Sequence, residues 1–94
     1  MNIRRVQLDV DWAASGPGIR DVAEAIDDVT GVAAATIIIT EIDLETIGTD
    51  IAIEGQDVDL DELIKAIENA GAVVHSIDLL AFGERIVDHI PRVR

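Results

Sequence analysis

The sequence contains no cysteine and no tyrosine, and only one phenylalanine, one tryptophan and one lysine among its 94 residues. Without cysteine it has no disulfides, no thiolate metal sites and no thiol chemistry. Its apolar runs are far shorter than the ~20 residues that span a bilayer. The N-terminal residues are not followed by an apolar stretch of signal-peptide length. We therefore expect a cytoplasmic protein without a membrane partner.

Basic residues are scarce as well. The sequence has 7 of them and 19 acidic residues, which gives a formal net charge of −12. No basic stripe is present to neutralise phosphates, which argues against nucleic-acid binding. Like charges repel each other and destabilise a compact chain, but molar salt shortens the Debye length to ~3 Å and screens the repulsion. The composition therefore predicts an acidic surface of the haloarchaeal kind; the alternative is an ordinary acidic cytoplasmic protein.

The first half of the chain has a clear hydrophobic period. Apolar and polar residues alternate over 3–11, which predicts a strand with one buried face. Apolar residues recur at helical spacing over 19–29, with Ser15 placed to cap a helix and Gly31 placed to end it. The pattern predicts a strand followed by an amphipathic helix.

The middle of the chain is rich in β-branched residues. The segment 32–45 predicts a long strand. A hairpin turn is expected at 46–50, centred on Gly48, followed by a shorter strand over 51–55. These segments predict a hairpin that joins the two halves of the chain.

The second half repeats the order of the first. Asp59 and Glu62 have capping-box spacing and predict a helix over 59–70. Residues 72–82 are again typical of a strand. The predicted order is β-α-β-β-α-β, an α+β ferredoxin-like sandwich with an antiparallel four-stranded sheet and two helices on one face. We assign residues 1–83 to this domain and residues 84–94 to a C-terminal arm or short strand.

Several segments resemble one family. The segments are Ile3-Arg4-Arg5 with Leu8-Asp9-Val10, Glu41-Ile42-Asp43-Leu44-Glu45-Thr46, Ile51-Ala52-Ile53-Glu54-Gly55, and His75-Ser76-Ile77-Asp78 with Gly83 and Arg85-Ile86-Val87. Together they resemble the archaeal domain-of-unknown-function family 211 over residues 2–88. The resemblance implies a ferredoxin-like domain, an archaeal source and a cyclic homo-oligomer, and it implies no activity. The chain departs from the family at 11–17, where a Lys-Pro-His-Glu-Pro-like segment is usual, so no role of that His or Glu is carried over.

Carboxylates supply the only candidate site. Alternating acids would share one face of a strand, and converging oxygen ligands suit calcium or magnesium. The alternative is a solvated acidic edge, and for the histidine a hydrogen-bonded structural role. The predicted metal ligands are Glu41, Asp43, Glu45, Asp9, Asp78 and His75, with the histidine beside Asp78.

One feature of the pattern conflicts with this site. Ile37 and Ile39 share parity with Glu41, so either the strand runs out past the helices or a bulge shifts its register. Ile38 and Ile42 are expected on the sheet face away from the helices, where a second subunit would cover them. The arginines near the chain ends are expected to pair with carboxylates across such an interface: Arg4, Arg5, Arg85, Arg92 and Arg94.

Three functions remain open. The first is a homo-oligomeric, non-enzymatic assembly or regulatory module that binds a small ligand between subunits. The second is a divalent-cation binding protein that uses the carboxylates. The third is an enzyme with an active site between subunits, which is the weakest because no nucleophile–base pair is evident. No catalytic residue is assigned.

Overall fold

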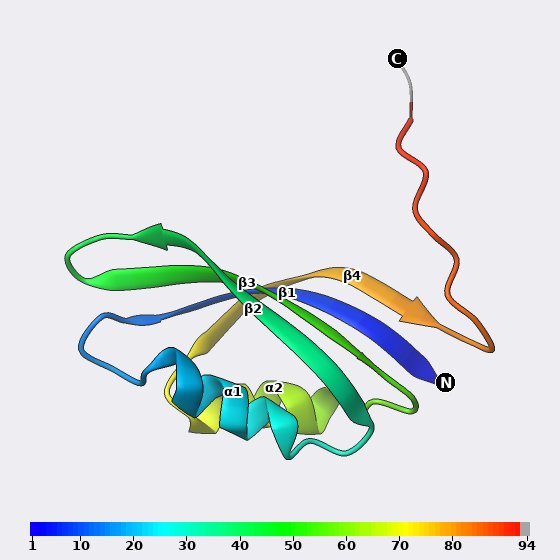
Figure 1. The fold of residues 1–94 in the computed structure, drawn as a ribbon, viewed down its shortest axis with the longest axis horizontal. Coiled ribbons are helices and arrows are strands. Elements are labelled where there is room, and N and C mark those ends of the chain that lie inside the picture. The colour runs from blue at the N-terminus through cyan, green and yellow to red at the C-terminus, as the bar shows by residue number, and fades with distance from the viewer. Residues whose placement is uncertain (93–94) are drawn as a thin grey trace.

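The computed structural model describes residues 1–92 and has the predicted order of elements. Its sheet is four-stranded and antiparallel, with strand order β2-β3-β1-β4, and both helices lie on one face of it (Figure 1). This confirms the α+β ferredoxin-like arrangement. The elements are β1 (Ile3–Ala13), α1 (Ile19–Asp27), β2 (Val32–Ile42), β3 (Thr46–Gly55), α2 (Leu60–Asn69) and β4 (Val73–Phe82).

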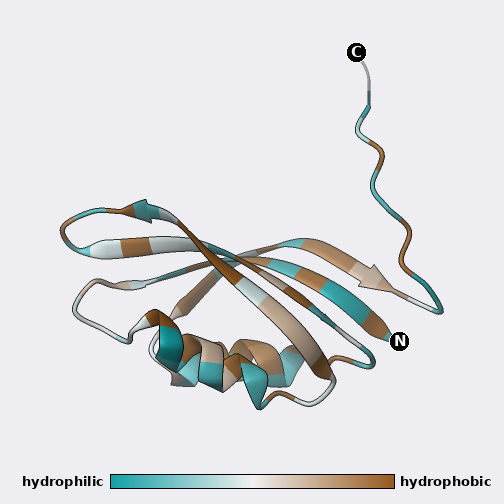
Figure 2. Ribbon diagram, viewed as in Figure 1, coloured by the Kyte–Doolittle hydropathy of each residue, from teal (hydrophilic) through white to brown (hydrophobic). Residues whose placement is uncertain are grey.

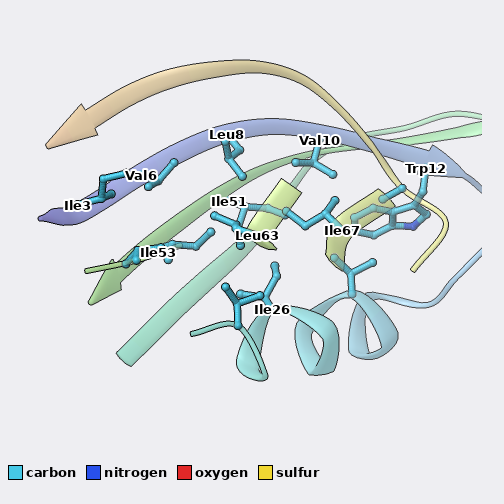
Figure 3. Packing of buried hydrophobic residues seen from close by; sticks show 14 residues of the cluster. Ile3, Val6, Leu8, Val10, Trp12, Ile26, Ile51, Ile53, Leu63 and Ile67 are labelled. Atoms are coloured by element: carbon cyan, nitrogen blue, oxygen red, sulfur yellow. The ribbon is translucent and has the colours of Figure 1, made fainter. Parts of the chain in front are cut away.

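Alternation in the central strands builds the core. The apolar residues of β1 and β3 that face the helices are almost fully buried, and Leu63 and Ile67 of α2 pack against them (Figure 3). Burying one such side chain stabilises the fold by roughly 1.5–3 kcal/mol. Trp12, 3% exposed, closes one end of this core.

Acidic side chains accept backbone N–H groups at the start of both helices. The Asp59 Oδ1 accepts the Glu62 N–H at 3.0 Å, as the capping-box spacing predicts. The Glu62 carboxylate accepts the Thr30 N–H at 2.6 Å, so it ties α2 to the loop after α1. Ser15 is not the cap of α1. Gly18 holds that position, and its N–H donates to the Asp21 Oδ2 at 2.9 Å.

Glycine is required where the loop after α1 meets the end of β3. Gly31 has φ +89°, and a Cβ there would lie 2.6 Å from the carbonyl oxygens of Gln56 and Asp57. A Cβ on Gly55 would overlap the Gly31 carbonyl oxygen. The two backbones therefore touch, and the Gln56 N–H donates to that same oxygen at 3.0 Å.

The turn between β2 and β3 comes earlier than predicted. β2 ends at Ile42, residues 43–45 form the turn, and β3 begins at Thr46. The Asp43 Oδ1 accepts the N–H groups of Glu45 and Thr46, each at 2.9 Å, which is the local hydrogen bonding that favours Asp in turns. The prediction of a turn at 46–50 is wrong because this aspartate closes the hairpin; Gly48 lies inside β3.

A bulge in β2 resolves the parity conflict. The pairing with β3 shifts between Ile39 and Glu41, which leaves Thr40 as the extra residue. Beyond the bulge Glu41 lies opposite Gly48, while Ile42 lies opposite Ile47, a residue that packs on the core. Ile42 is therefore on the helix side of the sheet, and its predicted place on the other face is wrong.

The described part of the C-terminal segment, residues 84–92, contains neither helix nor strand. It leaves β4 at Gly83, which has φ +107°, and extends away from the two helices (Figure 1). We call residues 84–92 the arm. Val93 and Arg94 of the predicted arm lie outside the described residues, and contact with a neighbouring subunit stays a prediction.

Candidate functional site on the open face of the sheet

The sheet face away from the helices, called the open face below, carries several carboxylates. Every second residue of β1 and β3 points to it, and these residues lie opposite one another in the pairing. Hydrophobic residues dominate the covered face, whereas the open face carries six carboxylates among neutral side chains and Arg5. The open-face acids are Asp9, Asp11, Glu41, Asp50, Glu54 and Asp78.

Two carboxylates face each other at the centre of this face. Asp9 of β1 lies directly opposite Asp50 of β3. Like charges in such a cross-strand pair destabilise a sheet. Asp78 of β4 and Asp50 line the same hollow of about 230 Å³, which Ile38 borders. Asp50 therefore lies close to other carboxylates on two sides, and a bound cation would relieve the repulsion.

A second polar group lies toward the Trp12 end of β1. The His75 Nε2 is 2.9 Å from the Asp11 Oδ2, so the two form an ion pair when the imidazole is protonated. A Cβ on Gly48 would lie 3.4 Å from the Asp11 Oδ1 and 3.5 Å from the Glu41 Cβ. Because glycine has no side chain, the space between Asp11 and Glu41 is left open.

The structure divides the predicted metal ligands into two groups. Glu41, Asp9 and Asp78 lie on the open face, but Asp43 and Glu45 lie in the turn, beyond the end of β2. The strand alternation assumed for Glu41, Asp43 and Glu45 is therefore wrong. Within residues 1–92, no three acidic or histidine side chains converge as a metal centre.

Asp43 has a structural role in the turn. Hydrogen bonds from the backbone N–H groups of Glu45 and then Thr46 stabilise its charged form and lower the pKa of the Asp43 carboxyl from its ordinary value. Both N–H groups meet the same Oδ1 atom. This side chain holds the hairpin closed.

His75 and Asp78 have different partners from those predicted. His75 meets Asp11, and Asp78 accepts a hydrogen bond from the Ser76 hydroxyl at 2.7 Å. Two irregularities in the pairing of β4 with β1 make His75 and Asp78 the extra residues. A bulge re-aims the side chains of its strand. The sequence carries no distinctive signal for these two bulges, so it could not indicate Asp11 as the partner of His75.

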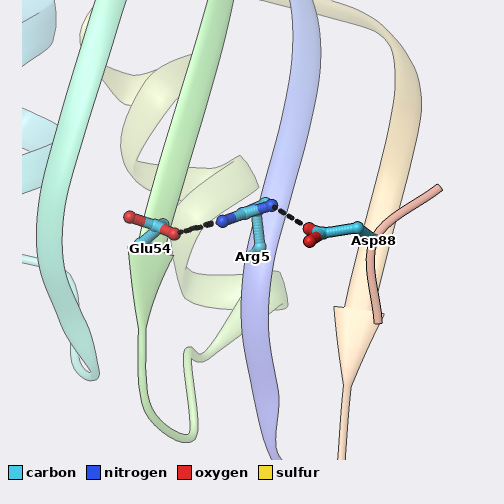
Figure 4. A network of polar contacts seen from close by, with 3 residues as sticks. All are labelled: Arg5, Glu54 and Asp88. Atoms are coloured by element: carbon cyan, nitrogen blue, oxygen red, sulfur yellow. Dashed lines mark hydrogen bonds and ion pairs between the residues drawn. The ribbon is translucent and has the colours of Figure 1, made fainter. Parts of the chain in front are cut away.

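Arginine side chains near the N-terminus have partners within the chain. The Arg5 Nη2 lies 2.7 Å from the Glu54 Oε1, and its Nη1 lies 3.8 Å from the Asp88 Oδ1 of the arm (Figure 4). The Arg4 Nε donates to the Gly83 carbonyl at 2.6 Å. A groove of about 880 Å³ lies between the arm and the open face beside Arg5. The predicted pairing across an interface stays a prediction for the remaining arginines.

Fold and surface together define a ferredoxin-like α+β protein with one apolar sheet face covered by the helices and one open face that carries carboxylates. Residues 4–94 match the family DUF211, described as "Uncharacterized ArCR". The chain is 34% identical over 88 residues to a Methanocaldococcus jannaschii protein described as "Uncharacterized protein MJ0319", covering 94% of this chain and 90% of that one. The chain belongs to the DUF211 family. No helix within residues 1–92 has the length and apolar character needed to cross a membrane.

Proposed function

We propose that the protein is a cytoplasmic, homo-oligomeric assembly or regulatory module without enzymatic activity, whose subunits enclose a small ligand between them. The exposure of β2 carries this proposal. Ile38 is 57% exposed, Ile39 is 40% exposed and Ile42 is 71% exposed. Ile38 lies on the open face and Ile42 on the helix side, so this strand exposes large apolar side chains on both faces, as strands at interaction sites do.

The acidic surface sets the conditions for assembly. Copies that each carry −12 repel one another in dilute buffer. At about 1 M salt the Debye length is ~3 Å, so charges repel one another only at very short range. Burial of apolar surface then decides the equilibrium between monomer and oligomer. A halophilic protein would meet these conditions in its own cytoplasm, and we propose that setting here.

Two grooves offer space for a ligand between subunits. One lies between α1 and β2 with a volume of about 560 Å³, and the other is the groove beside the arm. Ligand sites are concave, and ligands of drug size are mostly enclosed in them. A second copy placed over either groove would supply the missing wall.

Light scattering after size exclusion tests the assembly. In NaCl at about 1 M we expect a mass that is a multiple of 10.1 kDa, and at about 0.1 M, where the Debye length is ~10 Å, a shift toward smaller species. A mass of 10.1 kDa at both concentrations, over the full protein range, would overturn the proposal. Thermal shifts with amino acids, nucleotides and metal ions then test the ligand.

A second function, binding of calcium or magnesium, is favoured by the opposed carboxylates of Asp9 and Asp50. Hard divalent cations take oxygen ligands and complete their shells with water, so a pair of acids can hold one at the surface. Asp78 and Glu41 lie on the same sheet and would add to the negative field, whereas His75, whose Nε2 meets Asp11, carries no negative charge and would not. Titration calorimetry at low salt should show binding that is weakened in Asp50→Asn but not in Asp27→Asn, a matched change on α1. Equal heats in both variants would contradict a specific site.

A further inference from the structure

A cavity of about 700 Å³ lies at the Trp12 end of the sheet, apart from the hollow at Asp50 and from the two grooves described above. Three segments that are distant in sequence line it: the end of β1 with Ser15, the turn between β2 and β3, and the start of β4. The Ala14 N–H donates to the Glu45 carbonyl at 2.8 Å, so the first two segments are held together. The volume is typical of ligand sites, which measure ~300–1,000 Å³.

The walls of this cavity combine apolar and acidic side chains. Leu44 and Val73 are exposed apolar residues of the lining, and Asp11 and Glu45 supply carboxylates. Figure 2 shows hydrophobic and hydrophilic residues next to each other in the turn between β2 and β3. Within residues 1–92, no lysine or arginine lines the cavity, so its field favours a cation. The apolar walls favour an organic cation, because a hydrated metal ion gains nothing from them.

The contact with His75 orients the Asp11 carboxylate in this cavity. The His75 Nε2 meets the Asp11 Oδ2, while Oδ1 lies over Gly48, where no side chain fills the space. A donor on a ligand can therefore approach Oδ1 from that space. A primary ammonium group has three N–H donors, and its hydrogen bonds to a carboxylate are of the strong, charge-assisted kind.

Trp12 contributes a second polar group to the lining. Its indole is 3% exposed, and the buried Nε1 has no hydrogen-bond partner within residues 1–92. Figure 3 shows this nitrogen on the side of the ring away from the other labelled core residues. Buried donors without an acceptor are rare, and leaving one unpaired destabilises the fold. A ligand that carries a neutral oxygen into the cavity would supply the acceptor.

We propose that this cavity binds a small organic amine whose ammonium group pairs with Asp11 and whose neutral oxygen accepts the Trp12 N–H group. An amino alcohol with a short apolar chain has this combination, and its chain would lie against Leu44 and Val73. The inference goes beyond the proposed function, because every lining residue belongs to one copy and no second subunit is needed.

Three compounds of equal chain length separate the contributions of the two groups. 4-Amino-1-butanol has both, 1-butylamine lacks the oxygen, and 1,4-butanediol lacks the charge. In titration calorimetry at one fixed ionic strength, the dissociation constant of the diol should exceed that of the amino alcohol at least about tenfold, and that of butylamine should exceed it about two- to tenfold. If the amino alcohol does not bind, or the diol binds as tightly, the inference is wrong.

A matched pair of variants tests the role of Asp11. Asp11→Asn keeps the size of the side chain, removes its charge and should raise the dissociation constant of 4-amino-1-butanol at least about tenfold. Asp61→Asn removes the same charge from α2, outside the cavity, and should change it less than about twofold, because salt screens a distant charge. An equal rise in both variants would show attraction to the acidic surface as a whole and would overturn the inference. Circular dichroism verifies the fold of each variant.

The indole N–H group gives a second readout that needs no variant. The chain has one tryptophan, so protein labelled with nitrogen-15 shows a single indole N–H signal in nuclear magnetic resonance spectra. 4-Amino-1-butanol should move this signal to lower field as the N–H gains an acceptor, and 1-butylamine should move it less. MgCl2 at the same ionic strength should leave it in place. A signal that does not respond to the amino alcohol, or that MgCl2 moves as far, would contradict the inference.

The outcomes separate this inference from the proposed function. A protein that has a mass of 10.1 kDa at every salt concentration and still binds the amino alcohol removes the assembly and keeps the inference. An oligomer that binds none of the three compounds keeps the assembly and removes the inference.

Discussion

The covered face and the open face of the sheet are made from alternate residues of the same strands, but they have opposite properties. On β1, Leu8 is 1% exposed among apolar neighbours, while Asp9 lies opposite another aspartate. One face supplies the stability of the fold, and the other opposes it through charge repulsion. A domain of this kind stays folded because burial on one side outweighs repulsion on the other.

Shortening a core residue should have the largest effect. Leu8→Ala removes buried methyl groups from the centre of the covered face and should lower the free energy of unfolding by about 2.7–5.0 kcal/mol. Its neighbour Gln7 is exposed on the open face, and Gln7→Ala should change this free energy by less than about 0.5 kcal/mol. Urea denaturation in high salt measures both. Similar losses in the two variants would mean that the faces do not differ as described.

Removing one of the opposed acids should have a smaller effect of the opposite sign. Asp50→Asn relieves its repulsion with Asp9 and should raise the free energy of unfolding by roughly 0.2–1 kcal/mol at low salt. The gain should vanish at about 1 M NaCl, where the Debye length is ~3 Å. Thermal melts at the two salt concentrations, with Asp27→Asn as the charge-matched control, measure it. A gain that persists at high salt would not be electrostatic.

The smallest effect is expected at the hairpin turn, and it depends on pH. The pKa of Asp43 is lowered by two backbone N–H groups, so its contribution to stability is fully present above the ordinary value of 3.8. That contribution is lost as the pH falls through the lower pKa of the folded state. Asp43→Ala should therefore melt below the wild type at neutral pH and approach it in acid. Glu45→Ala, a change of the same charge in the same turn, should show no such convergence.

The hydrophobic period was sufficient to predict the fold. The alternation over residues 3–11 and the helical spacing over 19–29 report burial on one side of an element, and burial is what orders the layers. Capping was predicted in part, since Asp59 accepts its hydrogen bond but Glu62 bonds to Thr30, a residue distant in sequence. Local spacing cannot indicate a partner that only the folded chain brings near.

The arrangement of the site could not be predicted because it depends on bulges. One extra residue at Thr40 moves Ile42 to the helix side and brings Glu41 opposite Gly48. The extra residues of β4 likewise decide that His75 meets Asp11. If a strand is assumed to alternate strictly, every residue beyond a bulge is assigned to the wrong face. The strand itself is then predicted correctly, but the partners of its side chains are not.

The position of Trp12 gives the protein a built-in optical probe. The chain has one tryptophan and no tyrosine, so near-ultraviolet absorbance and emission come almost entirely from a single indole. That indole is 3% exposed, and its Nε1 has no hydrogen-bond partner within residues 1–92. Loosening of that end of the core admits water to the ring and its N–H group, and emission then moves to longer wavelength. Unfolding and its dependence on salt can both be followed without attaching a dye.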